Sequence, residues 1–104
     1  MIKFEYHNSE IVDLADWKAL FLTGVIIRGT IKRDDAFVMS GNGFEIDVTV
    51  VEIKSNDKIS KKAVAGNNVT LALYNYELCL NGHIPDNIKF ENYDTLIFTE
   101  RKKV

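Results

Sequence analysis

The chain has 104 residues, the size of one ordinary domain, and 46% of them are apolar, which excludes wholesale disorder. The 13 basic and 15 acidic residues give a net charge of -2, so the chain lacks the strong positive charge typical of nucleic-acid-binding domains. The single cysteine, Cys79, excludes an internal disulfide and suits a reducing compartment. No apolar run is long enough for a secretion signal or a membrane span, so we expect a cytoplasmic protein without a membrane partner.

The first segment to interpret, Ser9 to Leu20, is compatible with two structures. Ser9 can cap a short helix that has apolar residues at helical spacing, and the same residues can equally form a strand. We favour the strand, and the helix stays open as the alternative. The next segment, Leu20 to Ile27, is almost entirely apolar and predicts a strand buried on both faces. Glycine weakens a strand interior, so Gly24 predicts a bend or a close backbone approach.

The middle of the chain predicts a hairpin and a bent strand. Asn42-Gly43 lies between two apolar runs, and this dipeptide is the strongest short-range hairpin signal. After it, apolar residues alternate with polar ones from Phe44 to Val50, and the phase then flips so that Val51 and Ile53 are apolar. A period of two cannot change phase without an extra residue, so we predict a bulge or strong bend near Val50-Val51.

Further turn and strand signals follow. Gly66-Asn67 predicts a turn before a strand that starts at Asn68, and Asn81-Gly82 predicts a hairpin turn after a strand over residues 76–80. Leu96 and Phe98 alternate with Thr95, Ile97 and Thr99 and predict a last strand. Many short strands with regular turns indicate an all-β fold. We predict residues 1–104 to form a single domain, a small closed β-barrel of six to seven antiparallel strands with Greek-key connections.

Three blocks of the sequence together resemble a known family. The first is Thr23-Gly24 with Arg28-Gly29 and Ile31-Lys32, the second is Val48-Thr49-Val50-Val51-Glu52, and the third is Ala63-Val64-Ala65-Gly66-Asn67-Asn68-Val69. In this order and spacing they are similar to the second domain of translational GTPases of the elongation factor Tu type, a β-barrel that follows the GTPase domain. The resemblance covers about residues 11–98.

The sequence also departs from that family. Asp34 and Tyr93 stand where the family has turn glycines, and the connection from Tyr76 to Lys89 is longer than usual. The sequence contains no G-x-x-x-x-G-K-[ST] motif, so there is no phosphate cradle for nucleotide hydrolysis. The resemblance therefore implies the barrel standing alone, without a GTPase domain.

The resemblance implies a ligand class and candidate binding residues. In the family this barrel seats the aminoacylated end of tRNA or touches ribosomal RNA, and the positions that match Glu52 and Asn68 lie near that pocket. We add Arg28 and Lys54 as basic residues that can reach a phosphate. A structural role is the favoured interpretation of Glu52 and Asn68, because asparagine commonly satisfies a tight turn and glutamate commonly lies on an exposed strand face.

No constellation of residues predicts catalysis, a metal or a cofactor. Cys79 and His83 could form a nucleophile and a base, but the neighbours of Cys79 are apolar, and a cysteine in such a context usually packs as a small hydrophobe. Two such ligands are also too few for a zinc site. Tyr74 and Tyr76 could stack nucleic-acid bases if both lie on one strand face. The basic run at Arg101 is interpreted as a solvated, frayed terminus.

Two functions remain after these exclusions. The first is a non-enzymatic binding module for RNA, tRNA or the ribosome, which the resemblance implies. The second is a protein-interaction or regulatory module that keeps only the scaffold. The arrangement of charge discriminates between them: RNA binding needs Arg28, Lys32, Arg33 and Lys54 on one face, whereas a protein-binding module exposes an apolar patch. The oligomeric state is not specified by the sequence.

Overall fold

The computed structural model describes residues 1–101. Nine strands and one helix are present in this part of the chain. Their bounds are β1 Ile2–Leu14, β2 Trp17–Arg28, β3 Thr30–Lys32, β4 Ala36–Gly41, β5 Phe44–Ser55, β6 Lys58–Ser60, β7 Lys62–Val64, β8 Asn68–Tyr74, α1 Tyr76–Asn81 and β9 Thr95–Glu100.

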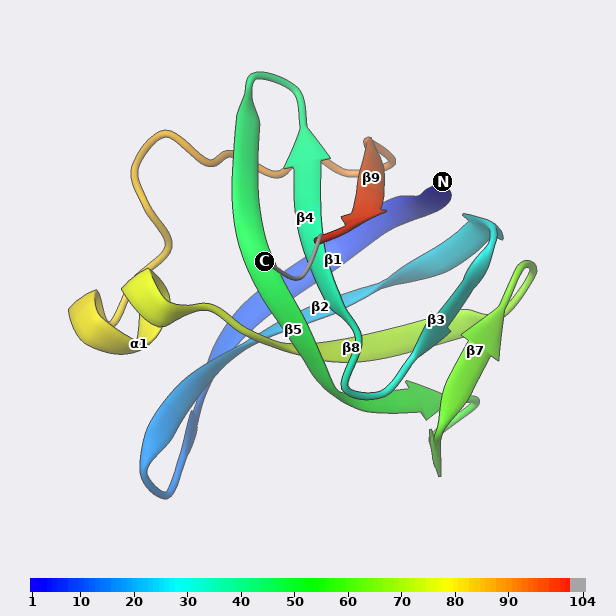
Figure 1. Ribbon diagram of the computed structural model, residues 1–104, viewed down its shortest axis with the longest axis horizontal. Helices are drawn as coiled ribbons and strands as arrows, with labels where there is room; N and C mark the ends of the chain where they lie inside the picture. Colours follow the sequence, from blue (N-terminus) through cyan, green and yellow to red (C-terminus); the bar gives the residue numbers. More distant parts are fainter. Residues whose placement is uncertain (102–104) are drawn as a thin grey trace.

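Six of these strands close into a ring. The order of hydrogen-bonded neighbours is β4-β9-β1-β2-β8-β5, and β5 pairs back onto β4 to complete the circuit, all in antiparallel fashion. Figure 1 shows β5 and β4 crossing in front of β1, β2 and β8. Their inward side chains form one core with three phenylalanines at its centre, Phe4, Phe37 and Phe98. The predicted all-β fold with a closed sheet is confirmed.

The segment from Ser9 to Leu20 takes the strand alternative and forms most of a hairpin. β1 and β2 pair along almost their whole length, down to Leu14 opposite Trp17, so the two residues between them form a tight turn. The helix alternative for residues 9–20 is therefore wrong. The β4–β5 hairpin turns at Asn42-Gly43 as predicted, and Gly43 supplies a positive φ of 81°.

The bend in β5 lies where the sequence predicts it. The register between β5 and β8 shifts between Val50 and Glu52, which leaves Val51 as the extra residue. Val48 and Val50 point inward before the shift, and Ile53 points inward after it. The bulge occurs as the pairing of β5 passes from β4 to β8, with Thr49 paired to both, so the bend carries one strand around the corner of the ring.

Gly24 lies at a close backbone approach, as expected. It faces Tyr6 where the β1–β2 register shifts, and a Cβ at this position would overlap the carbonyl oxygen of Glu5. The expectation that β2 is buried on both faces is wrong, because Thr23 and Ile27 are exposed while Leu22 and Ile26 are buried. The second face of β2 is open to solvent at Thr23 and Ile27, whereas near Ala19 and Leu20, both buried, α1 contacts the strand.

The segment after β8 is a helix, not the predicted strand and hairpin. The side chain of Asn75 accepts a hydrogen bond from the Leu78 N–H at the start of α1, and Gly82 ends the helix with a φ of 78°. Asn81-Gly82 is therefore a helix terminus, because glycine in the left-handed region closes helices as readily as hairpins. Only Leu78 of α1 is buried, so its burial does not follow the alternation expected of a strand.

The chain from α1 to β9 covers one end of the core without regular structure. Phe90 stacks on Tyr6 with ring centroids 4.9 Å apart and meets Phe44 edge-on. Ile88 is buried against the same cluster. At the opposite end, β3 and β7 form a separate two-stranded ribbon, which lies to the right in Figure 1 while α1 lies to the left. No helix among residues 1–101 is long and apolar enough to cross a bilayer.

Candidate functional site

Three of the four predicted binding residues lie together on the outer face of the ring. Glu52 pairs with Ala72 and Lys54 pairs with Thr70, in the part of β5 that follows the bulge. Asn68 is two residues before Thr70 on β8, on the same face and diagonal to Lys54. We call these three residues the β5–β8 face. The bulge creates it, because without the extra residue Glu52 and Lys54 would point into the core.

Arg28 does not join that face. It ends β2, where it pairs with Lys3, and it follows the phase of the buried Ile26 rather than that of the exposed Ile27. It also precedes β3, whereas Lys32 ends that strand, so the length of β3 separates the two cations. The four cations expected on one face, Arg28, Lys32, Arg33 and Lys54, are therefore divided among three places.

The structure instead gathers a different set of four cations. Lys32 on β3 lies directly opposite Lys62 on β7 in the antiparallel register. Arg33 follows Lys32 and donates its backbone N–H to the carbonyl of Lys61 at 2.9 Å. This bond keeps Arg33 and Lys61 side by side. All four side chains are exposed and line a shallow depression of about 500 Å³. We call Lys32, Arg33, Lys61 and Lys62 the basic ribbon.

Sequence reasoning missed half of this set. Lys61 and Lys62 precede the alanine-glycine block that carries the resemblance, but their partners depend on the pairing of β3 with β7. That pairing joins residues about thirty positions apart. The signal that could have found it is the match between two short segments, because Ile31 and Ala63 are both apolar and each has one lysine beside it at an exposed position.

The basic ribbon is scarcely neutralised by its own chain. Arg33 has one weak, exposed ion pair, with Asp34 at 4.0 Å. Among residues 1–101, no carboxylate lies within ion-pair distance of the side-chain amines of Lys32, Lys61 or Lys62. Like charges directly opposite each other destabilise a strand pair. The ribbon therefore retains an unfavourable arrangement that an anionic ligand would relieve.

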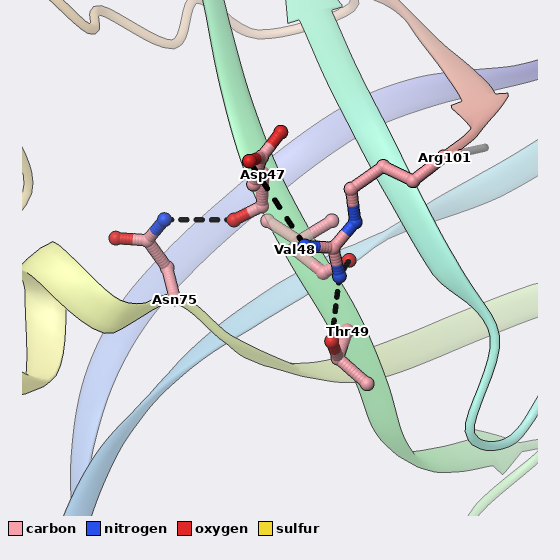
Figure 2. A network of polar contacts seen from close by, with 5 residues as sticks. All are labelled: Asp47, Val48, Thr49, Asn75 and Arg101. Carbon is pink, nitrogen blue, oxygen red and sulfur yellow. Dashed lines mark hydrogen bonds and ion pairs between the residues drawn. The ribbon is translucent and has the colours of Figure 1, made fainter. Parts of the chain in front are cut away.

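A second concave site lies on the opposite side of the molecule, between β5 and α1. Its volume is about 590 Å³, and β5, α1 and the segment around Pro85 contribute walls. Figure 2 shows how the strand wall is held: the amide nitrogen of Asn75 donates to the Asp47 carbonyl at 2.7 Å, and Arg101 donates to the Val48 carbonyl and the Thr49 hydroxyl. We call this site the α1 cleft.

Arg101 is thus a structural residue, contrary to the expectation of a frayed terminus. Its guanidinium spans β5 and also lies 3.9 Å from the Asp47 carboxylate, and its side chain is only 34% exposed. The rest of the basic run, Lys102-Lys103, lies outside the described residues.

The two tyrosines proposed for base stacking do not share a strand face. Tyr74 ends β8 and packs edge-on against Trp17, whereas Tyr76 is the first residue of α1. Both tyrosines nevertheless line the α1 cleft. They reach this site from a strand end and a helix start, an arrangement that the sequence did not indicate.

Cys79 and His83 each hydrogen-bond to a backbone carbonyl and not to each other. The Cys79 thiol donates to the carbonyl of Lys18 at 3.2 Å, and the His83 ring contacts the carbonyl of its neighbour Ile84. Within residues 1–101, no three His, Cys, Asp or Glu side chains gather in a way that could hold a metal ion.

The fold has counterparts among solved structures. Translation elongation factor SelB from Methanococcus maripaludis, in its apo form, superposes with a TM-score of 0.66 at 16% identity, over 94% of this chain and 18% of that chain. The GTPase-like domain of S. cerevisiae Ski7, bound to GTP or to GDP and inorganic phosphate, superposes with a TM-score of 0.64 at 12% identity, over 94% of this chain and 23% of that chain. The chain has the fold of a β-domain of translational GTPases.

At these identities the superpositions establish the fold alone, and they confirm the resemblance on that level. The chain spans about a fifth of the length of the SelB and Ski7 chains, so it corresponds to one domain of such proteins. No protein-family profile matches the sequence, and no curated protein matches it.

Proposed function

We propose that this chain is a non-enzymatic module that contacts RNA in a translation-related setting, with the basic ribbon on the phosphate backbone. The observation that carries the proposal is the Lys32–Lys62 pair, two cations held opposite each other without a carboxylate partner in the described chain. Arg33 and Lys61 extend the same positive surface. The translation-factor fold supplies the setting.

The acidic balance of the whole chain does not oppose this role. Charges interact over a Debye length of about 8 Å at physiological ionic strength, so a phosphate at the ribbon responds to the nearby cations and not to the net charge of -2. Contacts of this kind are independent of base sequence and release condensed counterions, which makes binding fall steeply with salt.

The β5–β8 face is the proposed second contact. Its three residues include the positions that the resemblance assigns to the aminoacylated end of tRNA, Glu52 and Asn68. The side-chain amide of Asn68 can both donate and accept hydrogen bonds, and Glu52 can accept from an amine or a hydroxyl. Lys54 adds a positive charge next to them for the terminal phosphate. Arg28, which lies apart from this face, is proposed to contact more distant phosphates.

The test is a binding measurement of the purified chain with deacylated tRNA at several salt concentrations. With four cations engaged, the slope of log K against log salt should be about -3. The double variant Lys32→Ala with Lys62→Ala should weaken binding about tenfold or more and flatten that slope by about 1.5. Glu52→Ala with Asn68→Ala should instead lower the preference for aminoacylated over deacylated tRNA.

A matched control separates ribbon contacts from overall charge. Lys58→Ala with Lys89→Ala removes the same two charges from exposed positions outside the ribbon. We expect this control to bind nearly as the parent chain does. Equal weakening by both double variants, or retention of tRNA no better than by an unrelated acidic protein, would overturn the RNA proposal.

A protein-binding module is the second candidate function. Tyr76 and Leu80 are 66% and 68% exposed and lie one turn apart on α1, which gives an apolar surface of the kind found in protein interfaces. A pull-down from native lysate that yields a stoichiometric partner, lost in Tyr76→Ser with Leu80→Ser, would support it. Recovery of the same proteins by that variant would contradict it.

A further inference from the structure

The α1 cleft has the size of a ligand-binding site, and hydrogen bonds hold its walls in place. Its volume of about 590 Å³ lies within the range of pockets that hold small ligands or single long side chains. The strand wall is fixed from both sides, because Asn75 and Arg101 each hydrogen-bond to backbone carbonyls of β5. Asn75 also caps α1, so the helix wall and the strand wall are joined through one buried side chain.

The charges that line the α1 cleft are mostly negative. Glu45 and Asp47 project from β5, and Glu77 projects from the first turn of α1. Among the lining residues that the structure describes, the one cation is Arg101, whose two terminal guanidinium nitrogens already contact Asp47, the Val48 carbonyl and the Thr49 hydroxyl. Among residues 1–101, Glu45 and Glu77 have no ion-pair partner. The cleft therefore presents two free carboxylates on facing walls.

Two tyrosine rings stand beside these carboxylates. Tyr74 is held edge-on by Trp17 at a centroid distance of 5.6 Å, and Tyr76 is two-thirds exposed at the start of α1. Aromatic faces attract cations, most of all the guanidinium group, which also stacks flat on a ring. Carboxylates and tyrosines in one cleft favour a planar cation over either a metal ion or an anion.

From this geometry we infer that the α1 cleft binds an arginine side chain presented by a peptide segment of a partner protein. The guanidinium lies between Tyr76 and the carboxylates of Glu45 and Glu77, where it can form charge-assisted hydrogen bonds. The exposed Leu80, one turn along α1 from Tyr76, offers an apolar contact for a neighbouring residue of the same peptide. In Figure 1, α1 lies across the molecule from β3 and β7, so the α1 cleft and the basic ribbon can be occupied at once.

The experiment is a titration of the ¹⁵N-labelled chain with acetyl-Gly-Ser-Arg-Ser-Gly-amide, followed by amide chemical shifts. The matched probe replaces arginine with citrulline, which has nearly the same shape and no charge. We expect the arginine peptide to bind with a dissociation constant on the order of 1 mM and to shift amides around Tyr74, Tyr76 and Glu77. The citrulline peptide should bind about fivefold more weakly than the arginine peptide.

Variants of the chain locate the charge. Glu45→Gln with Glu77→Gln keeps the size of both side chains and should weaken the arginine peptide about fivefold, to the level of the citrulline peptide. Glu10→Gln with Glu91→Gln removes the same charge from exposed positions elsewhere and should leave binding unchanged. Equal binding of the two peptides, equal weakening by both double variants, or shifts confined to other surfaces would overturn the inference. So would displacement of the peptide from the cleft by a single-stranded oligouridine, which would identify the cleft as an RNA contact.

Discussion

The side chain of Asn75 joins two elements that are far apart in the sequence. Its nitrogen donates to the Asp47 carbonyl at 2.7 Å, and its oxygen accepts from the Leu78 N–H at 2.9 Å. Asn75 is the one buried polar side chain among residues 1–101, with 7% of its surface exposed. Both functional groups of the amide are satisfied, so the position of α1 against β5 depends on this residue.

Replacement of Asn75 should therefore act in two steps. Asn75→Ala removes the helix cap and leaves the Asp47 carbonyl without its donor, and we expect the free energy of unfolding to fall by about 2 kcal/mol. In Asn75→Ser the serine can still cap the helix but cannot reach Asp47. We expect this substitution to lower the free energy of unfolding by about 1 kcal/mol. Urea denaturation measures both. A loss for serine as large as that for alanine would show that the cap contributes nothing.

Gly24 should be the glycine of this chain that tolerates replacement least. A Cβ there would overlap the Glu5 carbonyl oxygen and lie 2.8 Å from the ring of Phe4, which is itself fully buried. Neither group can move without disturbing the β1–β2 pairing, so we expect Gly24→Ala to lower the free energy of unfolding by about 3 kcal/mol.

The control for Gly24 is a glycine with space around it. Gly43 has no atom within 4 Å of an added Cβ, and only its φ of 81° opposes a side chain. Gly43→Ala should lower the free energy of unfolding by about 1 kcal/mol, the strain of one left-handed residue. Thermal or urea unfolding of both variants compares steric overlap with backbone strain. Equal losses would contradict the close approach at Gly24.

Local sequence patterns predicted the ring better than they predicted the sites. The phase flip at Val50-Val51 identified the bulge, because a strand with one buried face cannot change phase in any other way. The segment after Asn75 was misread because Tyr76, Leu78 and Leu80 fit a strand period as well as one turn of helix, and Asn81-Gly82 ends either element. Short segments do not carry enough repeats to decide.

The sites depended on contacts that no local pattern contains. The basic ribbon requires β3 to pair with β7, and the α1 cleft requires the chain around Pro85 to face β5. The resemblance named Glu52 and Asn68 together, and they do lie on one face, because motif spacing carries information about neighbouring strands; their role as binding residues stays a prediction. Lys61 and Lys62 belong to no motif, and only the fold shows that they meet Lys32 and Arg33.

The Lys32–Lys62 pair predicts a trade-off between folding stability and RNA binding. Lys62→Glu turns a repulsive cross-strand pair into an attractive one, so the free energy of unfolding should rise by about 0.5 kcal/mol at low salt. The same change should weaken tRNA binding about tenfold, because it replaces a cation of the ribbon with an anion. Urea denaturation and tRNA binding on the same preparation test both. A variant that gains stability and keeps full tRNA affinity would exclude the pair from the RNA contact.

Asp34 offers the reverse test, because we expect it to lower both the folding stability and the affinity for tRNA. It adopts a φ of 75° at a position where the resembling family has glycine, and among residues 1–101 its carboxylate is the one anion that lines the ribbon depression. Asp34→Gly should therefore raise the free energy of unfolding by about 0.5 kcal/mol, the relief of left-handed strain less the added freedom of the unfolded chain. It should also strengthen tRNA binding by about twofold, since its ion pair with Arg33 is exposed and weak.

The matched variant Asp34→Ala separates charge from backbone strain. Alanine removes the same carboxylate, so tRNA binding should strengthen as it does for glycine. Stability should instead fall by about 0.5 kcal/mol, because alanine tolerates the left-handed region less well than aspartate does. Salt titration of tRNA binding, with urea denaturation alongside, distinguishes the two effects. If glycine strengthens tRNA binding and alanine does not, backbone freedom and not charge limits the contact, and the ribbon would have to change shape on binding.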